Sequence, residues 1–381
     1  MKILITSDWD LSVVNGVVTS IVNLRDELTK QGHEVRILTL AKGLKNGSAE
    51  DTYVVGAVNA ALMYPGLRVR VRRGSKVINE LIKWKPDVIH SQCEFSTFGL
   101  ARRISKKTGA PIVHTFHTVY EDYTHYFCPS KKVGRAMVAS LTRYITNRSD
   151  AVIVPTDKVR ELFEGYKVVD KVYVIPTGIV IDKFKTEEAG RRGEELRDKL
   201  FGDVENVILE AIGRLAKEKN LEEILEMLRN ENTGAKLMVV GGGPYQNNLE
   251  SKAKELGVTD KVHFTGMISP DNVADYYKVG DLFVCASTSE TQGLTYVEAL
   301  ASGRPLLCKK DKCLDGIVED GFNGWQYTSA KDFLEKLVLY KSMTSEERKR
   351  LSENAVATAD RFSSGTFAVN AFNLYTELIG A

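Results

Sequence analysis

Short apolar runs alternate with longer amphipathic segments through the first half of the chain. A short apolar run between turn residues predicts a buried strand, and apolar residues three or four positions apart predict a helix. We expect strands over residues 2–6, 34–40, 88–90, 111–115 and 151–155, and helices over 16–28, 68–83, 96–107 and 131–147. The region from 41 to 66 is looser. This alternation predicts a parallel, doubly wound sheet.

The same alternation starts again in the second half of the chain. Strands are expected over residues 172–175, 207–212, 236–240, 262–264 and 282–285, and helices over 221–228, up to 256, over 274–278, from 294 to 302 and over 366–379. Asn220 is of a type that caps the N-terminus of a helix, here the helix ending at Leu228. The pattern predicts a second sheet of the same kind.

Two Rossmann-like α/β domains facing across a cleft account for this pattern. We place the N-terminal domain at 1–176, completed by the C-terminal helix within 362–381, and the second domain at 177–361. The charge-rich segment 187–199 is the expected seam between them. Ligands of such sheets bind at the carboxyl ends of the strands, so the loops after the predicted strands are the places to look for chemistry.

Composition and cysteine usage favour a cytoplasmic protein. The 381 residues are 43% hydrophobic and 27% charged, as is usual for globular proteins, and no stretch of about 18 apolar residues is present. The first residues turn acidic too early for a signal peptide and predict a strand. The five cysteines have no paired spacing, which points to reduced thiols.

Positive charge is concentrated in the first half of the chain. Residues 1–176 hold 26 Lys and Arg against 17 Asp and Glu, although the whole chain has a net charge of only +2. A basic half can indicate an anionic partner, either nucleic acid or a membrane surface. Solvated helix faces explain the same charges equally well. Nucleic acid is disfavoured, because no recognisable binding module accompanies the basic clusters.

The stretch 287–305 joins a predicted strand to a predicted helix through a polar loop with glycine. The first N–H groups of a helix, here the one starting at Leu294, have no partners within it and favour an anion. Glu290 in the loop and Glu298 about one turn into the helix could hold hydroxyls at the two ends of a nucleotide sugar. The alternative is a surface loop and an ordinary helix, because short motifs match by chance.

Three other clusters follow predicted strands. Gly16 opens the first helix and lets a phosphate or sugar approach the backbone closely. His117 could donate to a hydroxyl or transfer a proton, although a lone strand-end histidine, like His114 before it, is more often structural. Arg214 and Lys219 could clamp a diphosphate, the first as a planar fork and the second as a point charge. Such cations neutralise the charge that builds on a departing nucleoside diphosphate.

In this order the clusters resemble the retaining nucleotide-sugar glycosyltransferases of family 4, which have the GT-B architecture. The matching pieces span nearly the whole chain: Asn15-Gly16, Phe116-His117, Gly213-Arg214 with Lys219, and Glu290 and Glu298 with seven residues between them. The resemblance implies a donor site in the second domain. It assigns the diphosphate to Arg214, Lys219 and the N–H groups of Gly293, Leu294 and Thr295, the donor sugar to Glu290 and His117, the ribose to Glu298, and close approach of the donor to Gly16.

Three stretches, 90–96, 114–126 and 289–296, resemble the bacterial diacylglycerol α-glucosyltransferases, which make monoglucosyldiacylglycerol. This resemblance implies transfer of glucose from UDP-glucose to the 3-hydroxyl of 1,2-diacylglycerol, with no cofactor and no metal. The leaving diphosphate would accept the proton of the acceptor, so no strong protein base is needed. Gln292 stands where many family members have an aromatic residue, and Asn15 stands where many have a first glycine. Asp8-Trp9-Asp10 has the spacing of a metal-binding Asp-x-Asp motif, but we expect these residues to form the end of a strand or a turn instead.

The expected acceptor and membrane residues lie in the basic first half, which suits an anionic lipid surface at the inner face of the cell membrane. They are Arg68, Arg70, Arg72, Arg73, Lys76, Tyr120, Tyr123 and Tyr126. Two other functions stay open. One is the same donor chemistry on a soluble or polyprenyl-linked glycan, and the other is a non-catalytic protein that binds sugar nucleotides.

Overall fold

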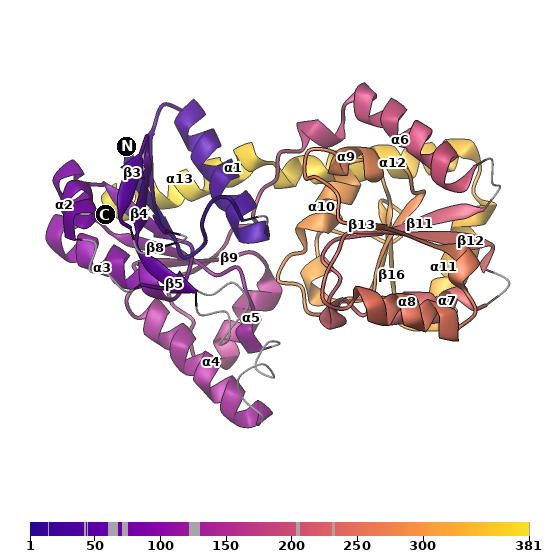
Figure 1. Cartoon of the computed structure of the whole chain (residues 1–381), viewed down its shortest axis with the longest axis horizontal. Coiled ribbons are helices and arrows are strands. Elements are labelled where there is room, and N and C mark those ends of the chain that lie inside the picture. The colour runs from indigo at the N-terminus through magenta and orange to yellow at the C-terminus, as the bar shows by residue number, and fades with distance from the viewer. Residues whose placement is uncertain are drawn as a thin grey trace. The chain divides into compact units, whose positions relative to one another are not determined.

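A computed structural model divides the chain into two units, each with its own sheet and helices (Figure 1). Unit 1 comprises residues 1–179 and 364–381, and unit 2 comprises residues 180–363. The structure describes residues 1–13, 15–41, 43, 45–59, 68–70, 75–121, 130–202, 206–230 and 233–380. The boundaries expected from the sequence, after residues 176 and 361, fall slightly before the two points where the chain changes unit.

Unit 1 is built on a sheet with the strand order β10-β9-β8-β7-β1-β2-β4-β3. Its pairs are parallel except for β3 with β4, and β5 pairs with β6 in a separate antiparallel ribbon. The strands are β1 (Lys2–Ser7), β2 (Glu34–Leu40), β3 (Gly47–Ala49), β4 (Thr52–Val55), β5 (Ala57–Asn59), β6 (Arg68–Arg70), β7 (Val88–Ser91), β8 (Ile112–Thr115), β9 (Ala151–Val154) and β10 (Val172–Val174). The helices are α1 (Gly16–Lys30), α2 (Ser75–Trp84), α3 (Ser96–Thr108), α4 (Lys131–Thr146), α5 (Asp157–Gly165) and α13 (Ser364–Gly380).

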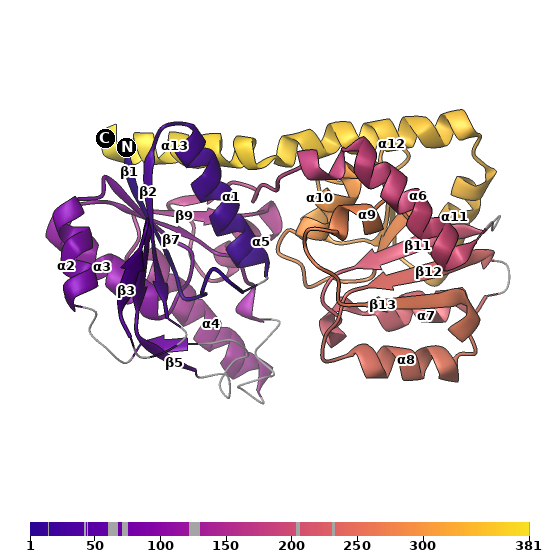
Figure 2. The same ribbon diagram turned by 45° about the horizontal axis from the view of Figure 1, so that its top comes forward.

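Both faces of this sheet are covered, which is why the central strands β7, β8 and β9 are buried along their whole length. On β1, Ile3 and Ile5 pack on the face covered by α1 and α13, while Leu4 packs on the face covered by α2 to α5 (Figure 2). The C-terminal helix α13 contributes Phe367 and Tyr375 to the first of these layers. Helix α13 is therefore part of the core of unit 1, although it follows all of unit 2 in the sequence.

Two expectations for unit 1 are wrong. Residues 68–83 were expected to form one helix, but Arg68–Arg70 is strand β6 and the helix α2 begins only at Ser75. The Arg-Val-Arg run fits both periods, and pairing with β5 selects the strand. The looser region contains β3, β4 and β5, of which β4 extends the parallel sheet beside β2.

Unit 2 contains a fully parallel sheet with the strand order β13-β12-β11-β14-β15-β16. Its strands are β11 (Val207–Ile212), β12 (Ala235–Val240), β13 (Val262–Gly266), β14 (Leu282–Cys285), β15 (Leu306–Lys309) and β16 (Gly324–Tyr327). Its helices are α6 (Glu187–Phe201), α7 (Leu221–Leu228), α8 (Gln246–Glu255), α9 (Val273–Tyr276), α10 (Leu294–Ala301), α11 (Ala330–Ser342) and α12 (Ser345–Ala359). Short 3₁₀ turns include η2 (Asp182–Phe184) and η3 (Lys217–Lys219).

The charge-rich segment 187–199 is not a seam, because it lies within helix α6 of unit 2. The charges of α6 form ion pairs within the helix, such as Arg191 with Glu195, and tie it to the rest of the unit. The guanidinium of Arg197 donates to the carbonyl of Val279 at 2.6 Å and to Asp281 at 3.1 Å. High charge density in this segment therefore reflects an anchored amphipathic helix.

Candidate active site

The loop between β14 and α10 is fixed to the segment that follows β11. The hydroxyls of Ser287 and Ser289 both donate to the backbone carbonyl of Glu218, at 3.3 and 3.4 Å. Within this arrangement the ammonium of Lys219 forms an ion pair with Glu290. The structure thus brings together two residues that are 71 positions apart in the sequence and that were both predicted for the donor site.

Gly293 shapes the start of helix α10. Its φ of 74° lies in the left-handed region, and a Cβ at this position would overlap the ring of the buried Tyr296. Leu294 and Thr295 follow as the first residues of the helix, so the N–H groups predicted to bind a diphosphate lie in its first turn. Thr295 is also close to Gly213, since a Cβ built on that glycine would lie 3.8 Å from Thr295 Cγ2.

Glycines allow the loops after β11 and β12 to lie against each other. A Cβ on Gly241 would overlap the carbonyl of Gly213, and a Cβ on Gly243 would overlap the carbonyl of Leu215. The N–H of Leu215 donates to the carbonyl of Gly242 at 3.0 Å. The backbone around Arg214 is therefore fixed on both sides, while its half-exposed side chain forms an ion pair with Glu218.

Glu298 lies inside α10 and is held by a buried tyrosine. The hydroxyl of Tyr277 donates to Glu298 Oε2 at 2.8 Å. Burial raises the pKa of Glu298 above its ordinary value, while the hydrogen bond from Tyr277 and the charge of Lys183 act in the opposite direction. Tyr277 thus fixes the orientation of the carboxylate expected to bind ribose.

The predicted residues of unit 1 lie at the carboxyl ends of its central strands. Gly16 is the exposed first residue of α1, and the side chain of Asn15 caps that helix by accepting from Val18 N at 2.8 Å. His117 follows β8, and its Nε2 lies 2.6 Å from Gln92 Oε1. Burial lowers the pKa of His117 to about 4, with Glu94 acting against this shift and His114 adding to it.

His114 and Tyr120 both lie beside the buried carboxylate of Glu94. The hydroxyl of Tyr120 donates to Glu94 Oε2 at 2.6 Å, and His114 Nε2 lies 3.8 Å from Glu94 Oε1. The ring of His114 is fully buried and meets Phe98 and Phe116 edge to face, as expected of a structural histidine. Tyr120, predicted for the acceptor side, therefore belongs to the polar group around Glu94.

Of the other residues predicted to bind the acceptor or the membrane, the structure describes only some. Arg68 and Arg70 are half-buried on β6, and Arg68 Nη1 lies 3.9 Å from Asp10 Oδ2. Lys76 is exposed on α2. Arg72, Arg73, Tyr123 and Tyr126 lie outside the described residues.

The two carboxylates of Asp8-Trp9-Asp10 accept hydrogen bonds from backbone N–H groups. The carboxylate of Asp8 accepts from the N–H groups of Thr97 at 2.8 Å and Phe95 at 3.2 Å at the start of α3, and Asp10 accepts from Ser12. Among the described residues no group of His, Cys, Asp and Glu is arranged to hold a metal ion.

One predicted cap is wrong. Asn220 precedes α7 with a left-handed φ of 52°, and its side chain forms no capping hydrogen bond. Its amide instead donates to Glu223 Oε2 at 2.7 Å. The sharp turn between η3 and α7 requires a left-handed backbone conformation at residue 220, and asparagine tolerates that conformation well.

Four residues of this site were not predicted individually. Glu218 pairs with Arg214, Tyr277 orients Glu298, and Gln92 and Glu94 contact His117 and Tyr120. A spacing of four between Arg214 and Glu218 is a common ion-pair signal. Tyr277 has no such signal, because it reaches Glu298 of α10 only once the chain has folded.

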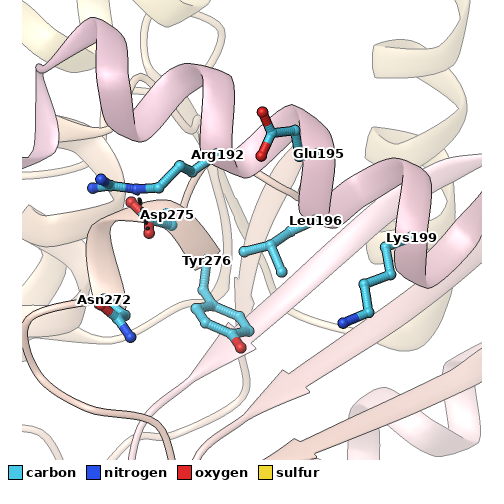
Figure 3. Close-up of a pocket in the computed structure, with 7 residues that line it drawn as sticks. All are labelled: Arg192, Glu195, Leu196, Lys199, Asn272, Asp275 and Tyr276. Atoms are coloured by element: carbon cyan, nitrogen blue, oxygen red, sulfur yellow. Dashed lines mark hydrogen bonds and ion pairs between the residues drawn. The ribbon is translucent and has the colours of Figure 1, made fainter.

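A separate pocket of about 400 Å³ lies between α6 and α9 (Figure 3). Arg192 Nε donates to Asp275 Oδ2 at 2.9 Å along one side of it. The lining balances the cations Arg192 and Lys199 with the anions Glu195 and Asp275. None of the predicted donor or acceptor residues lines this pocket.

Comparison with known proteins identifies the family and the fold. The profile of Glycosyltransferase Family 4 matches residues 14–183, and that of Glycosyl transferases group 1 matches residues 193–358. The fold resembles solved structures such as Anabaena HepE in complex with UDP and glucose, with a TM-score of 0.76, 17% identity and coverage of 99% of both chains. WaaG, a glycosyltransferase involved in lipopolysaccharide biosynthesis, gives a TM-score of 0.71 at 18% identity, covering 98% of this chain and 99% of its own. The two α/β units thus have the GT-B fold of these glycosyltransferases, which confirms the predicted fold class.

This chain belongs to glycosyltransferase family 4. It is 39% identical to an alpha-monoglucosyldiacylglycerol synthase of Streptococcus pneumoniae, over 87% of this chain and 76% of that protein. It is 30% identical to the alpha-monoglucosyldiacylglycerol synthase of Acholeplasma laidlawii, over 100% of this chain and 98% of that protein. The resemblance read from the sequence is confirmed. Within the described residues, no helix is both long enough and apolar enough to cross a membrane.

Proposed function

We propose that this protein transfers glucose from UDP-glucose to the 3-hydroxyl of 1,2-diacylglycerol with retention of configuration, at the inner surface of the cell membrane. The observation that carries the donor half is the contact of Lys219 with Glu290 beside the first turn of α10. A cation, a helix N-terminus and a carboxylate together match the diphosphate and the hydroxyl groups of a nucleotide sugar.

The acceptor half is supported by relatives. Two proteins named alpha-monoglucosyldiacylglycerol synthase match most of this chain, one of them over nearly its whole length. The choice of UDP is supported by the complex of HepE with UDP and glucose, which shares the fold. The proposed product is therefore α-monoglucosyldiacylglycerol.

In the proposed reaction, Arg214, Lys219 and the N–H groups at the start of α10 neutralise the diphosphate as the bond to the sugar breaks. Glu290 accepts from hydroxyls of the glucose, Glu298 from the ribose, and His117 contacts the sugar near its anomeric carbon. The acceptor hydroxyl attacks from the face that the diphosphate leaves. Its proton passes to a diphosphate oxygen, so the reaction needs no metal and no protein base.

Helix α4 supports attachment to a lipid surface. Its sequence has no acidic residue, and its four basic residues are all exposed: Lys131, Lys132, Arg135 and Arg143. Val133, Met137 and Tyr144 are also exposed, by 52%, 53% and 44%, and their spacing places them on one side of the helix. An exposed apolar row flanked by cations is typical of helices that lie in the interface of an anionic membrane. Each such cation contributes about 1 kcal/mol near that surface.

The proposal is tested by measuring UDP release and glycolipid formation from UDP-glucose, with vesicles that contain or lack diacylglycerol and anionic lipid. We expect diacylglycerol-dependent release with a glycolipid product, and loss of most turnover in Glu290→Gln. Replacing Val133 and Met137 by serine should lower turnover on vesicles about thirtyfold, because each residue contributes about 1 kcal/mol of apolar burial. The matched control replaces Val338 and Leu339, which are similarly exposed on α11 of unit 2.

Each contrary outcome points to one of the alternatives. Release of UDP that is indifferent to lipid would retain the donor site and favour a soluble or polyprenyl-linked acceptor. Donor binding without turnover on any acceptor would favour a non-catalytic protein that binds sugar nucleotides. Equal losses in the α4 variant and its α11 control would remove α4 from the membrane contact.

A further inference from the structure

Phe95 occupies the position before helix α3 that usually carries a capping side chain. Ser, Thr, Asp and Asn are preferred there, because their oxygen accepts from the first N–H groups of the helix. Phe95 forms no such hydrogen bond. The carboxylate of Asp8 supplies the cap instead, since it accepts from the N–H groups of Thr97 at 2.8 Å and Phe95 at 3.2 Å. Because the cap comes from the end of β1, position 95 can carry a side chain with another purpose.

The ring of Phe95 is exposed, although the residues around it are buried. Phe95 is 42% exposed, whereas Glu94 before it and Thr97 after it are 7% and 0% exposed. Its ring meets that of Tyr120 edge to face, with 6.0 Å between the ring centroids. The hydroxyl of Tyr120 in turn donates to the carboxylate of Glu94. The surface therefore presents a pair of aromatic rings, one of which is held by a buried carboxylate.

The ribbon of β5 and β6 adds exposed apolar side chains near Phe95. The backbone N–H of Arg70 on β6 donates to Ser96 Oγ at 3.2 Å, which places this strand beside the start of α3. Val69 and its cross-strand partner Val58 are 40% and 42% exposed, whereas Arg70 is half-buried. The solvated face of an antiparallel ribbon is usually polar, so this ribbon has the opposite pattern. An apolar ligand fits that pattern better than water does.

Phe95 lies at the topological switch point of the unit 1 sheet. Strands β1 and β7 are neighbours, but the chain leaves β1 toward β2 on one side and leaves β7 toward β8 on the other. Ligands of open α/β sheets bind beyond the carboxyl ends of two such strands. Asp8 follows β1 and Phe95 follows β7, and the hydrogen bond between them joins the two strand ends. The exposed ring therefore lies where a substrate of unit 1 is expected to bind.

We propose that Phe95 is a specificity-determining residue whose ring contacts the apolar part of the acceptor next to its reacting hydroxyl. This inference rests on the proposed function, with diacylglycerol bound by unit 1. The two ester-linked chains of diacylglycerol begin beside its free hydroxyl, so an apolar contact at the switch point favours this acceptor. A glycan acceptor would present hydroxyl groups there, and neither the phenyl ring nor the valines of the ribbon can form hydrogen bonds with them.

The test varies the mole fraction of 1,2-diacylglycerol in vesicles of anionic phospholipid, with enough lipid to bind all of the full-length protein. This design separates acceptor binding from vesicle binding, which is measured by sedimentation. In Phe95→Ser we expect the KM for diacylglycerol to rise at least about tenfold, because the apolar contact is lost. The kcat and the KM for UDP-glucose should stay within about twofold. Serine is a favoured capping residue, so folding should be retained, and Phe95→Leu should restore most of the affinity.

Phe322→Ser is the matched control, because Phe322 has the same exposed fraction of 42% but lies in unit 2. Its kinetic constants should equal those of the wild type. The same KM for diacylglycerol in Phe95→Ser and Phe322→Ser would overturn the inference and leave the proposed function intact. Weaker vesicle binding with an unchanged KM would also overturn it, because Phe95 would then be only a membrane anchor. A wild type that does not glucosylate diacylglycerol would instead overturn the proposed function, and the inference with it.

Discussion

Glu210 lies in the middle of strand β11, and replacing it by glutamine should stabilise unit 2 at neutral pH. The side chain is completely buried, and its Oε2 accepts from the N–H of Gly280 at 2.9 Å. Burial raises the pKa of Glu210 to about 8, although Arg304 and the hydrogen bond from Gly280 act in the opposite direction. The strand continues directly into the loop that carries Arg214, so this group lies under the donor site.

The sign and size of the effect follow from the two pKa values. Because the folded pKa of Glu210 exceeds the ordinary value of 4.5, its contribution to stability is fully present below pH 4.5 and is lost as the pH rises toward 8. At about 1.4 kcal/mol per pH unit, the loss across this window is at most about 5 kcal/mol. An effective dielectric constant near 20 at buried sites reduces it, and we expect at least about 2 kcal/mol.

Urea unfolding between pH 4.5 and 8 measures this loss, with Trp325 as the reporter for unit 2 after Trp9 and Trp84 of unit 1 are replaced by phenylalanine. The window stops at pH 8 because burial lowers the pKa of Lys278 to about 8, and at higher pH the titration of this lysine would dominate the slope. Wild-type stability should fall with rising pH, and Glu210→Gln should remove most of that slope. Parallel slopes in the two proteins would show that Glu210 does not hold a proton in the folded state.

Two further substitutions test the donor site. Gly293→Ala should weaken UDP binding at least about tenfold for two reasons. The alanine would have to adopt a left-handed φ, and its Cβ would overlap the ring of Tyr296. Gly316→Ala, with the same φ of 74° but open space around it, is the control for backbone strain, and equal losses of UDP affinity would refute the argument. Tyr277→Phe should raise the KM for the donor about threefold to tenfold with little change in kcat, because it removes one hydrogen bond that orients Glu298. A fall in kcat alone would contradict a role in ribose binding.

The sequence predicted those elements whose apolar pattern is unambiguous. The strand at 34–40 and the helix starting at Gly16 are found as expected, because each buries one consistent set of side chains. The wrong assignments share a cause in tertiary contacts. Residues 68–70 become a strand only because β5 lies beside them, and the charged segment 187–199 is an ordinary helix because its arginines find partners elsewhere in unit 2.

In the candidate site, too, some residues could be predicted from local sequence and others depend on tertiary contacts. Residues that begin or end an element, such as Gly16 and Gly293, could be found from turn chemistry and helix N-termini. The contact of Lys219 with Glu290 could be inferred only from the family resemblance, because two loops distant in sequence create it. Gln92 and Tyr277 carry no periodic or motif signal of their own, since each acts on another side chain.

The charges of the proposed donor site suggest an order in which it would recognise the parts of its ligand. Arg214 and Lys219 are each paired with a carboxylate of the same unit, Glu218 and Glu290, so the four side chains sum to no net charge. The cations of these pairs stay partly exposed, 51% for the side chain of Arg214 and 30% for that of Lys219, so a diphosphate that also gains the first N–H groups of α10 can replace the carboxylates as their partner. Once Lys219 turns to the diphosphate, Glu290 can accept from sugar hydroxyls. If the proposed donor site is right, a free sugar would leave the ion pair intact, and we expect the protein to bind glucose only when the diphosphate carries it.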